Sequence, residues 1–221
     1  MVKKQKSKSA VIVIPHVDDD FFSCWSVMSD PTYTDLKIVR CTTNERQENR
    51  AKIYEILKTP EYKGWVNPNL QVVNLFDPLP KDGELNQVSR KDVTTALDAI
   101  FSKDWIDELY FPAYSHHQDH EMVFKCCMSA LRMRRSLQVR SMFKYTYMYH
   151  NLGDESCIYK PMTMLQVNHQ VHILRKMNQL DTILDEKSVN SVDALKNDAI
   201  KHGKMINCQA AERFIPIRVV I

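Results

Sequence analysis

The sequence has little glycine and no long apolar run. Only four glycines occur among 221 residues, and the chain shows no internal repeat or biased segment, which excludes a fibrous or low-complexity protein. No segment approaches the roughly 20 consecutive apolar residues that span a bilayer. The short apolar stretch 10–15 runs directly into His16 and three aspartates, a continuation that no secretory signal peptide tolerates. We therefore expect an ordered protein that has no membrane partner.

Disulfide-forming cysteine patterns are also missing. The chain has six cysteines, none of them in a C-x-x-C pair, and two of them, Cys126 and Cys127, are adjacent. In a chain without an export signal, such thiols are expected to be reduced and buried. Cysteine usage therefore predicts a cytoplasmic protein.

The sequence also lacks a large excess of either positive or negative charge. The 30 basic and 27 acidic side chains leave a formal net charge of +3, and the segment 3–8 alone carries four lysines. The rest of the chain is close to neutral, whereas a nucleic-acid-binding protein needs a concentrated basic face. We expect a basic, disordered tail over residues 1–9, one domain over residues 10–221, and no nucleic-acid partner.

The hydrophobic pattern predicts an α/β fold. Hydrophobic residues make up 44% of the chain, enough for one sizeable core. Strand-like runs alternate with helix-length amphipathic segments, a pattern typical of a mostly parallel sheet with helices on both faces. The predicted strands are 11–14, 36–41, 72–76, 108–111, 143–149 and 214–221, and the predicted helices begin near 21, 47, 91, 119 and 189. The last strand is expected at an edge, because Pro216 has no amide donor.

The first chemical motif follows the first predicted strand. It contains His16 and the carboxylates of Asp18, Asp19 and Asp20. Open α/β sheets bind ligands at the carboxyl ends of their strands. Three consecutive carboxylates are costly at such a position unless they are solvated, hydrogen-bonded or bound to a metal. An acidic helix N-cap is the alternative, and the triplet alone does not decide between the two.

The second motif, residues 115–120, again lies between a strand and a helix. It contains three histidines, and His117 and His120 have the spacing that places two side chains on one face of a helical turn. The two motifs can open onto one crevice if their strands are neighbours. Two imidazoles and one carboxylate then match a catalytic zinc site with a position left for water. The same ligands also suit Fe²⁺.

Such a site predicts a metal-dependent amide hydrolase. Zinc lowers the pKa of a bound water to about 7 and polarises a carbonyl group. Asp18 is the candidate for the general base that takes the proton of the water. His117 is the candidate for stabilising the oxyanion or protonating the leaving amine, with Asp119 orienting His117.

The two motifs resemble the signatures of the PIG-L/LmbE family of zinc-dependent N-acetylglucosaminyl deacetylases. The family has HPDDE after a strand and a later HxDH, which read here as residues 16–20 (HVDDD) and 117–120 (HQDH). The resemblance implies a single-domain, Rossmann-like α/β fold with three layers. It also implies a site with metal ligands His16, Asp19 and His120, the general base Asp18, and the transition-state stabiliser His117 with Asp119 behind it.

Weaker similarities extend along the chain. The segment from Asn44 resembles the Arg-bearing loop and helix of the family, which implies that Arg46 contacts sugar hydroxyls. The loop 77–82 resembles the segment that supplies a substrate-binding aspartate, here Asp82 rather than Asp77. Val17 replaces the usual proline and Asp20 the usual glutamate, and neither change removes an implied metal ligand.

The resemblance implies that the protein removes acetyl from a soluble N-acetylglucosamine conjugate, because the chain has no spanning helix like that of the eukaryotic branch. A metal hydrolase of another amide or an ester is a second interpretation. A third is a non-catalytic sugar- or nucleic-acid-binding module, for which the basic segments 3–8 and 132–140 supply positive charge. The retained site residues favour an enzyme. The sequence does not fix the conjugate or the oligomeric state.

Overall fold

The computed structural model describes residues 8–132, 138–146, 156–180 and 186–219. Most of the predicted basic tail and the end of the predicted strand 143–149 lie outside these ranges. The chain forms one seven-stranded sheet with the order β3-β2-β1-β4-β5-β7-β6. The strands are β1 (Ser9–Ile14), β2 (Asp35–Arg40), β3 (Leu70–Asn74), β4 (Ile106–Pro112), β5 (Val139–Tyr145), β6 (Ile158–Met162) and β7 (Ala210–Arg218). The first five are parallel, and β7 is antiparallel to both of its neighbours.

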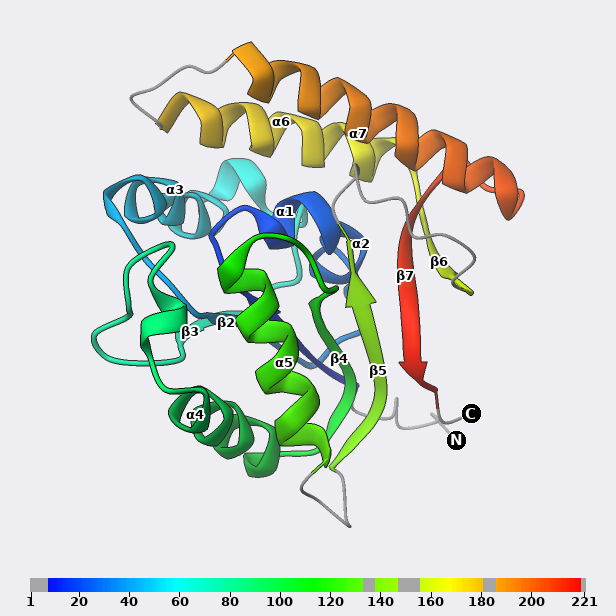
Figure 1. The fold of residues 1–221 in the computed structure, drawn as a ribbon. Coiled ribbons are helices and arrows are strands. Elements are labelled where there is room, and N and C mark those ends of the chain that lie inside the picture. The colour runs from blue at the N-terminus through cyan, green and yellow to red at the C-terminus, as the bar shows by residue number, and fades with distance from the viewer. Residues whose placement is uncertain (1–7, 133–137, 147–155, 181–185, 220–221) are drawn as a thin grey trace.

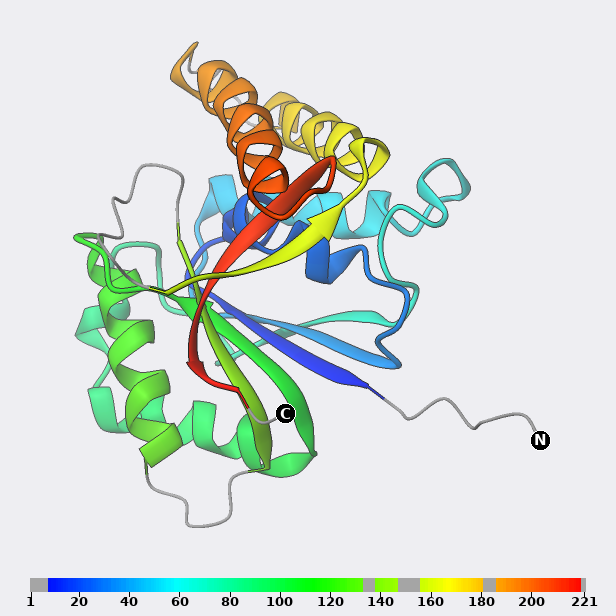
Figure 2. The same ribbon diagram turned by 90° about the vertical axis from the view of Figure 1, so that its right-hand side faces the viewer.

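Helices cover both faces of this sheet (Figures 1 and 2). One face carries α1 (Asp19–Ser23), α2 (Trp25–Met28), α3 (Glu45–Ile56), α6 (Met164–Leu180) and α7 (Glu186–Met205). The other face carries α4 (Arg90–Lys103) and α5 (Gln118–Arg132). Two short 3-10 helices, η1 (Pro60–Tyr62) and η2 (Leu85–Gln87), complete the set. The predicted three-layer, mostly parallel α/β fold is confirmed.

The central strand β1 shows why the sequence adopts this arrangement. Successive side chains of a strand point to opposite faces, and Ile12 and Ile14 pack in one core cluster while Val11 and Val13 pack in the other. A strand buried on both faces must be apolar throughout, as the run AVIVI is. No helix of the described residues is long and apolar enough to cross a membrane.

The predicted elements are present, with shifts at their ends. The helix expected from residue 21 is broken at Cys24 into α1 and α2, and β3 begins two residues before its predicted start. β6 and α6 were not predicted, although Val167, Val171 and Leu174 recur at helical spacing in α6.

The edge position predicted for the last strand is wrong. β7 lies between β5 and β6, so the edges of the described sheet are β3 and β6. Pro216 is tolerated because β6 pairs only with residues 210–214, so Pro216 lies beyond the end of that partner. The missing amide donor therefore falls where β7 has only one neighbour, β5.

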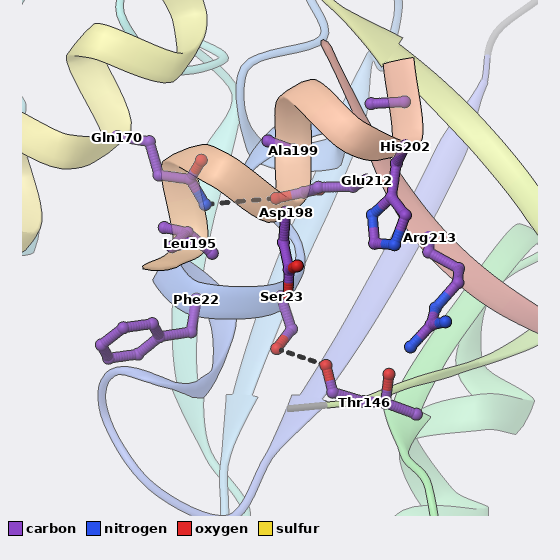
Figure 3. Close-up of a pocket in the computed structure, with 11 residues that line it drawn as sticks. Phe22, Ser23, Thr146, Gln170, Leu195, Asp198, Ala199, His202, Glu212 and Arg213 are labelled. Atoms are coloured by element: carbon purple, nitrogen blue, oxygen red, sulfur yellow. Dashed lines mark hydrogen bonds between the residues drawn. The ribbon is translucent and has the colours of Figure 1, made fainter. Parts of the chain in front are cut away.

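Glu212 of β7 attaches α2 to the sheet. Its carboxylate accepts hydrogen bonds from the amides of Trp25 and Ser26, both at 2.8 Å, and from the Ser26 hydroxyl at 2.6 Å. Gln170 of α6 donates a hydrogen bond to Glu212 at 3.3 Å (Figure 3). It also donates to the carbonyl of Phe21 at 2.8 Å. These bonds satisfy the first amides of α2, which would otherwise be unpaired. The small pocket beside them, about 50 Å³, has room only for water molecules.

Candidate metal centre

The two sequence motifs meet at the carboxyl ends of β1 and β4. These strands are neighbours in the sheet, with Ile12 of β1 aligned with Tyr110 of β4. His16 follows β1. His117 directly precedes α5, the helix that follows β4, and His120 lies on its first turn. The rings of His16 and His120 are 5.1 Å apart between centroids. Residues about 100 positions apart in the chain thus share one site.

Three ligand-type atoms converge there. His16 Nδ1 lies 3.2 Å from His120 Nε2 and 3.6 Å from Asp19 Oδ2, and His120 Nε2 lies 3.5 Å from Asp19 Oδ2. Ligand atoms bound tetrahedrally to zinc at about 2.0–2.1 Å are about 3.3 Å apart. The side chain of Asp19 is fully buried and that of His120 nearly so. Two imidazoles and a carboxylate in this geometry fit a divalent transition metal.

Contacts with the second nitrogen of His16 support this fit. His16 Nε2 lies 3.1 Å from Asp119 Oδ2 and 3.1 Å from Asp82 Oδ1. Histidines that ligate a metal usually donate their other ring N–H to a carboxylate, which fixes the tautomer and the ring orientation. With Nε2 as the donor, the lone pair of Nδ1 faces Asp19 and His120.

The electrostatics of this group follow from burial and these contacts. Burial lowers the pKa of His16, but the hydrogen bonds with Asp119 and Asp82 outweigh it and raise the pKa to about 10. The same bond with His16 holds the pKa of Asp82 at about 2. Burial lowers the pKa of His120, so its neutral, ligating form is favoured.

Asp119 occupies a different place from the one expected. It was expected behind His117, whereas its carboxylate accepts hydrogen bonds from His16 and from the amides of Gly83 at 2.6 Å and Leu85 at 3.2 Å. The reason is the loop before η2, which brings two amides to the start of α5. Asp119 therefore connects His16 to this loop.

We expect Asp119→Asn to weaken metal binding, because the amide cannot accept all of these hydrogen bonds. Removing a partner of this kind typically costs 10–100-fold, so an increase of about that size in the metal dissociation constant is expected. Competition with a chromogenic chelator measures it. If Asp119 acted through His117 instead, kcat would fall while metal affinity stayed unchanged.

Asp18 lies directly before α1, beside the three converging atoms. Its φ of 153° is unusual for a residue other than glycine, a type of strain that clusters at functional sites. Its carboxylate forms an ion pair with Arg50 of α3. Burial and the neighbouring charge of Asp19 raise the pKa of Asp18 to about 6, although Arg50 opposes the shift.

His117 and Arg46 also border the site. The ring of His117 lies 4.6 Å from that of His16 and 5.3 Å from that of His120, and it is close enough to be an alternative third ligand in place of Asp19. Arg46 is exposed on the first turns of α3. All eight residues named by the sequence analysis thus lie in or directly around one site.

A cavity of about 320 Å³ opens over these residues. Its wall also contains Gln47 and Arg50, which the sequence did not reveal, and Ser115 and His116, which belong to the second motif but had no predicted role. Arg46 and Arg50 are one turn apart on α3, and this spacing was the available signal for Arg50. Asn44 accepts a hydrogen bond from Gln47 N at 2.7 Å, so it caps α3 and directs the start of the helix toward the cavity.

Asp20, which stands where the family has glutamate, points away from the metal ligands into the core. It is fully buried, and its Oδ2 accepts a hydrogen bond from the Tyr54 hydroxyl at 2.8 Å. Burial raises the pKa of Asp20 to about 8. Its Oδ1 has no hydrogen-bond partner among the described residues, and a protonated carboxyl group lowers the cost of this arrangement.

No family model matches the chain. No curated protein sequence matches it either. Solved structures do match: N,N'-diacetylchitobiose deacetylase from Pyrococcus horikoshii, in complex with an inhibitor, has a TM-score of 0.68 at 16% identity and covers 96% of this chain and 85% of its own. The zinc-inhibited form of teicoplanin deacetylase Orf2 has a TM-score of 0.64 at 10% identity, covering 95% and 97%.

The chain has the fold of LmbE/PIG-L-type deacetylases. The fold alone does not fix the reaction. The 4-carboxy-2-hydroxymuconate hydratase GalB from Pseudomonas putida KT2440 matches about equally well, with a TM-score of 0.63 at 12% identity and coverage of 97% and 98%. The reaction depends on the residues of the site.

Proposed function

We propose that the protein is a metal-dependent amide hydrolase that removes the acetyl group from the 2-acetamido group of an N-acetylglucosamine conjugate. The observation that carries the proposal is the convergence of His16, Asp19 and His120 beside a carboxylate, Asp18, that is not needed as a ligand. The deacetylases among the structural neighbours support the same reaction. The chain from residue 10 to 221 is proposed as one catalytic domain acting in the cytoplasm.

In this proposal His16, Asp19 and His120 hold zinc or another divalent transition metal such as Fe²⁺. The bound metal would supply Lewis acidity that lowers the pKa of a water molecule and polarises the amide carbonyl. Asp18 takes a proton from the attacking water and later delivers it to the leaving nitrogen. His117 donates a hydrogen bond to the oxyanion as negative charge develops.

The remaining polar groups orient the reactants. Arg50 restrains the carboxylate of Asp18 through their ion pair, and Asp119 holds the ring of His16. Arg46, at the mouth of the cavity, is proposed to bind sugar hydroxyls. Asp82 is proposed to bind substrate as well, although His16 and Asn44, the latter at 2.8 Å, already hold its carboxylate.

Acetate release tests this function directly. Purified protein is first stripped of metal by chelation and then reloaded with zinc or iron. It is assayed on a panel of N-acetylglucosamine glycosides, with the matching O-acetyl esters and N-acetylated amino acids as comparisons. Release of equal amounts of acetate and free amine, lost on chelation and restored by metal, is expected for the glycosides. Turnover confined to the esters or amino acids would contradict the proposed substrate, and turnover without metal would contradict the mechanism.

A further inference from the structure

Asn44 uses both polar atoms of its side-chain amide. Its Oδ1 accepts a hydrogen bond from the Gln47 amide at 2.7 Å and so caps α3. Its Nδ2 donates a hydrogen bond to Asp82 Oδ2 at 2.8 Å. A helix cap needs only an acceptor, which serine or aspartate supplies equally well. Asparagine adds an N–H donor on a second atom, so Asn44 joins the start of α3 to a further group.

Asp82 lies between Asn44 and the candidate metal ligand His16. Its Oδ2 accepts from Asn44, and its Oδ1 lies 3.1 Å from His16 Nε2. Each carboxylate oxygen therefore faces one of the two partners. Hydrogen bonds with His16 and Gln47 outweigh burial and hold the pKa of Asp82 at about 2, so Asp82 is a carboxylate at neutral pH. These contacts form a continuous path from the start of α3 to the imidazole ring.

The main chain around Asp82 is tied to the segment that precedes α3. The Asp82 amide donates to the Thr43 carbonyl at 2.8 Å, and the Thr43 amide donates to the Pro80 carbonyl at 2.9 Å. Thr43 and Lys81 also form an isolated parallel bridge. These bonds hold the residue before Asn44 against the loop that carries Asp82, so the two side chains stay within hydrogen-bond distance.

The turn after Asp82 packs against α5. Gly83 has a φ of 79°, in the left-handed region that favours glycine, and a Cβ atom there would lie 3.4 Å from Gln118 Nε2. The Gly83 amide donates to Asp119 at 2.6 Å, and Asp119 is the second acceptor beside His16 Nε2. Because α3 and α5 cover opposite faces of the sheet (Figures 1 and 2), this turn connects the starts of both helices to one imidazole ring.

The start of α3 also fixes groups on the other side of the site. Arg46 and Arg50 lie one turn apart on this helix, and Arg50 forms an ion pair with Asp18. The cap at Asn44 determines where the helix begins and thus where both arginines lie. Asn44 therefore links the helix that restrains Asp18 to the carboxylate that restrains His16.

We propose that Asn44 is a positioning residue of the metal centre, which acts through Asp82 to fix the orientation of the His16 ring relative to α3. The inference rests on the proposed function, because it needs His16 as a metal ligand. It gives Asp82 a role at the metal centre that goes beyond a contact with the sugar. A partner that fixes the ring of a ligating histidine raises the affinity for the metal.

Asn44→Ser tests the proposal, because serine caps a helix but lacks the amide nitrogen that donates to Asp82. We expect the zinc dissociation constant to rise about tenfold, near the lower end of the usual range for such partners, because Asp119 still accepts from His16. Competition with a chromogenic chelator measures it while the metal-free protein is reloaded with zinc. Asn44→Thr is the second variant if Asn44→Ser does not fold. An unchanged dissociation constant would overturn the proposal.

Ser89→Ala is the matched control for a loss of capping alone. Ser89 caps α4 by accepting from the Asp92 amide at 3.1 Å, and it does not line the cavity over the metal ligands. We expect Ser89→Ala to lower the melting temperature of the metal-free protein and to leave the zinc dissociation constant unchanged. If Asn44→Ser changed only the melting temperature in the same way, Asn44 would be a helix cap alone and the proposal would be wrong.

A double-mutant cycle with Asp82→Ala shows whether Asn44 acts through Asp82. Asn44→Ser should weaken zinc binding in the wild-type background and have no further effect in the Asp82→Ala background, because the group on which it acts is then absent. Additive losses in the double variant would mean that Asn44 acts by another route, which contradicts the proposal.

Kinetics at saturating zinc separate this role from sugar binding. The KM of Asn44→Ser for the best glycoside of the panel should equal that of the wild type. A higher KM with unchanged zinc affinity would show that Asn44 and Asp82 serve only the sugar, which overturns the proposal and leaves the deacetylase intact. A protein that binds zinc but releases no acetate would refute the proposed function, while the dissociation constants would still decide the role of Asn44.

Discussion

Replacing His120 by alanine is expected to remove the bound metal and, with it, amide hydrolysis. His120 Nε2 is one of three converging atoms, and its loss leaves His16 Nδ1 and Asp19 Oδ2, 3.6 Å apart, as the remaining pair of the proposed ligand set. Loss of a partner behind a ligand typically costs 10–100-fold in metal affinity, so loss of a ligand should exceed about 100-fold. Elemental analysis after gel filtration and the acetate assay measure the two effects.

His172→Ala is the matched control for this variant. His172 is an exposed histidine of α6 that packs against Tyr62 and Trp65, not against the metal centre. Its metal content and rate should equal those of the wild type. Circular dichroism shows whether His120→Ala remains folded. This control is needed because His120 is buried, so its removal can also destabilise the fold. A folded His120→Ala protein with full metal content would exclude His120 as a ligand.

Replacing Asp18 by asparagine is expected to lower kcat without loss of metal. Asparagine has nearly the same shape but cannot accept the proton of the attacking water, and a positioned general base typically contributes 10²–10⁴-fold. A fall in kcat of about that size, with metal content and KM little changed, is the expected result. Steady-state kinetics on the best substrate of the panel, with metal analysis of the same sample, measures it.

Arg50→Gln separates this effect from the loss of the ion pair. The charge of Asp18 is partly balanced by Arg50, so Asp18→Asn also removes that interaction. If Asp18 acts as the base, Arg50→Gln should reduce kcat much less than Asp18→Asn. Equal losses of kcat in the two variants would indicate that Asp18 acts through its ion pair with Arg50 and not through proton transfer. Release of metal by Asp18→Asn would contradict the ligand set.

The candidate site could be recognised from the sequence because its chemistry is concentrated in two short segments. His16, Asp18 and Asp19 stand together after an apolar strand, and His117 and His120 have helical spacing. Local spacing of this kind survives folding, since neighbouring residues stay close whatever the rest of the chain does. The helix break at Cys24 could not be predicted from local spacing. It depends on Glu212, nearly 190 residues further along the chain, which accepts the amides of Trp25 and Ser26.

By itself the sequence determined the α/β class, the apolar central strand and the two groups of candidate metal-binding side chains, because each depends on residues close together in the chain. Only the tertiary structure decided the partner of Asp119 and the ion pair between Asp18 and Arg50. The meeting of the two motifs also depends on strand order, because it is the pairing of β1 with β4 that joins them. Strand order is set by long-range packing, which no local pattern records.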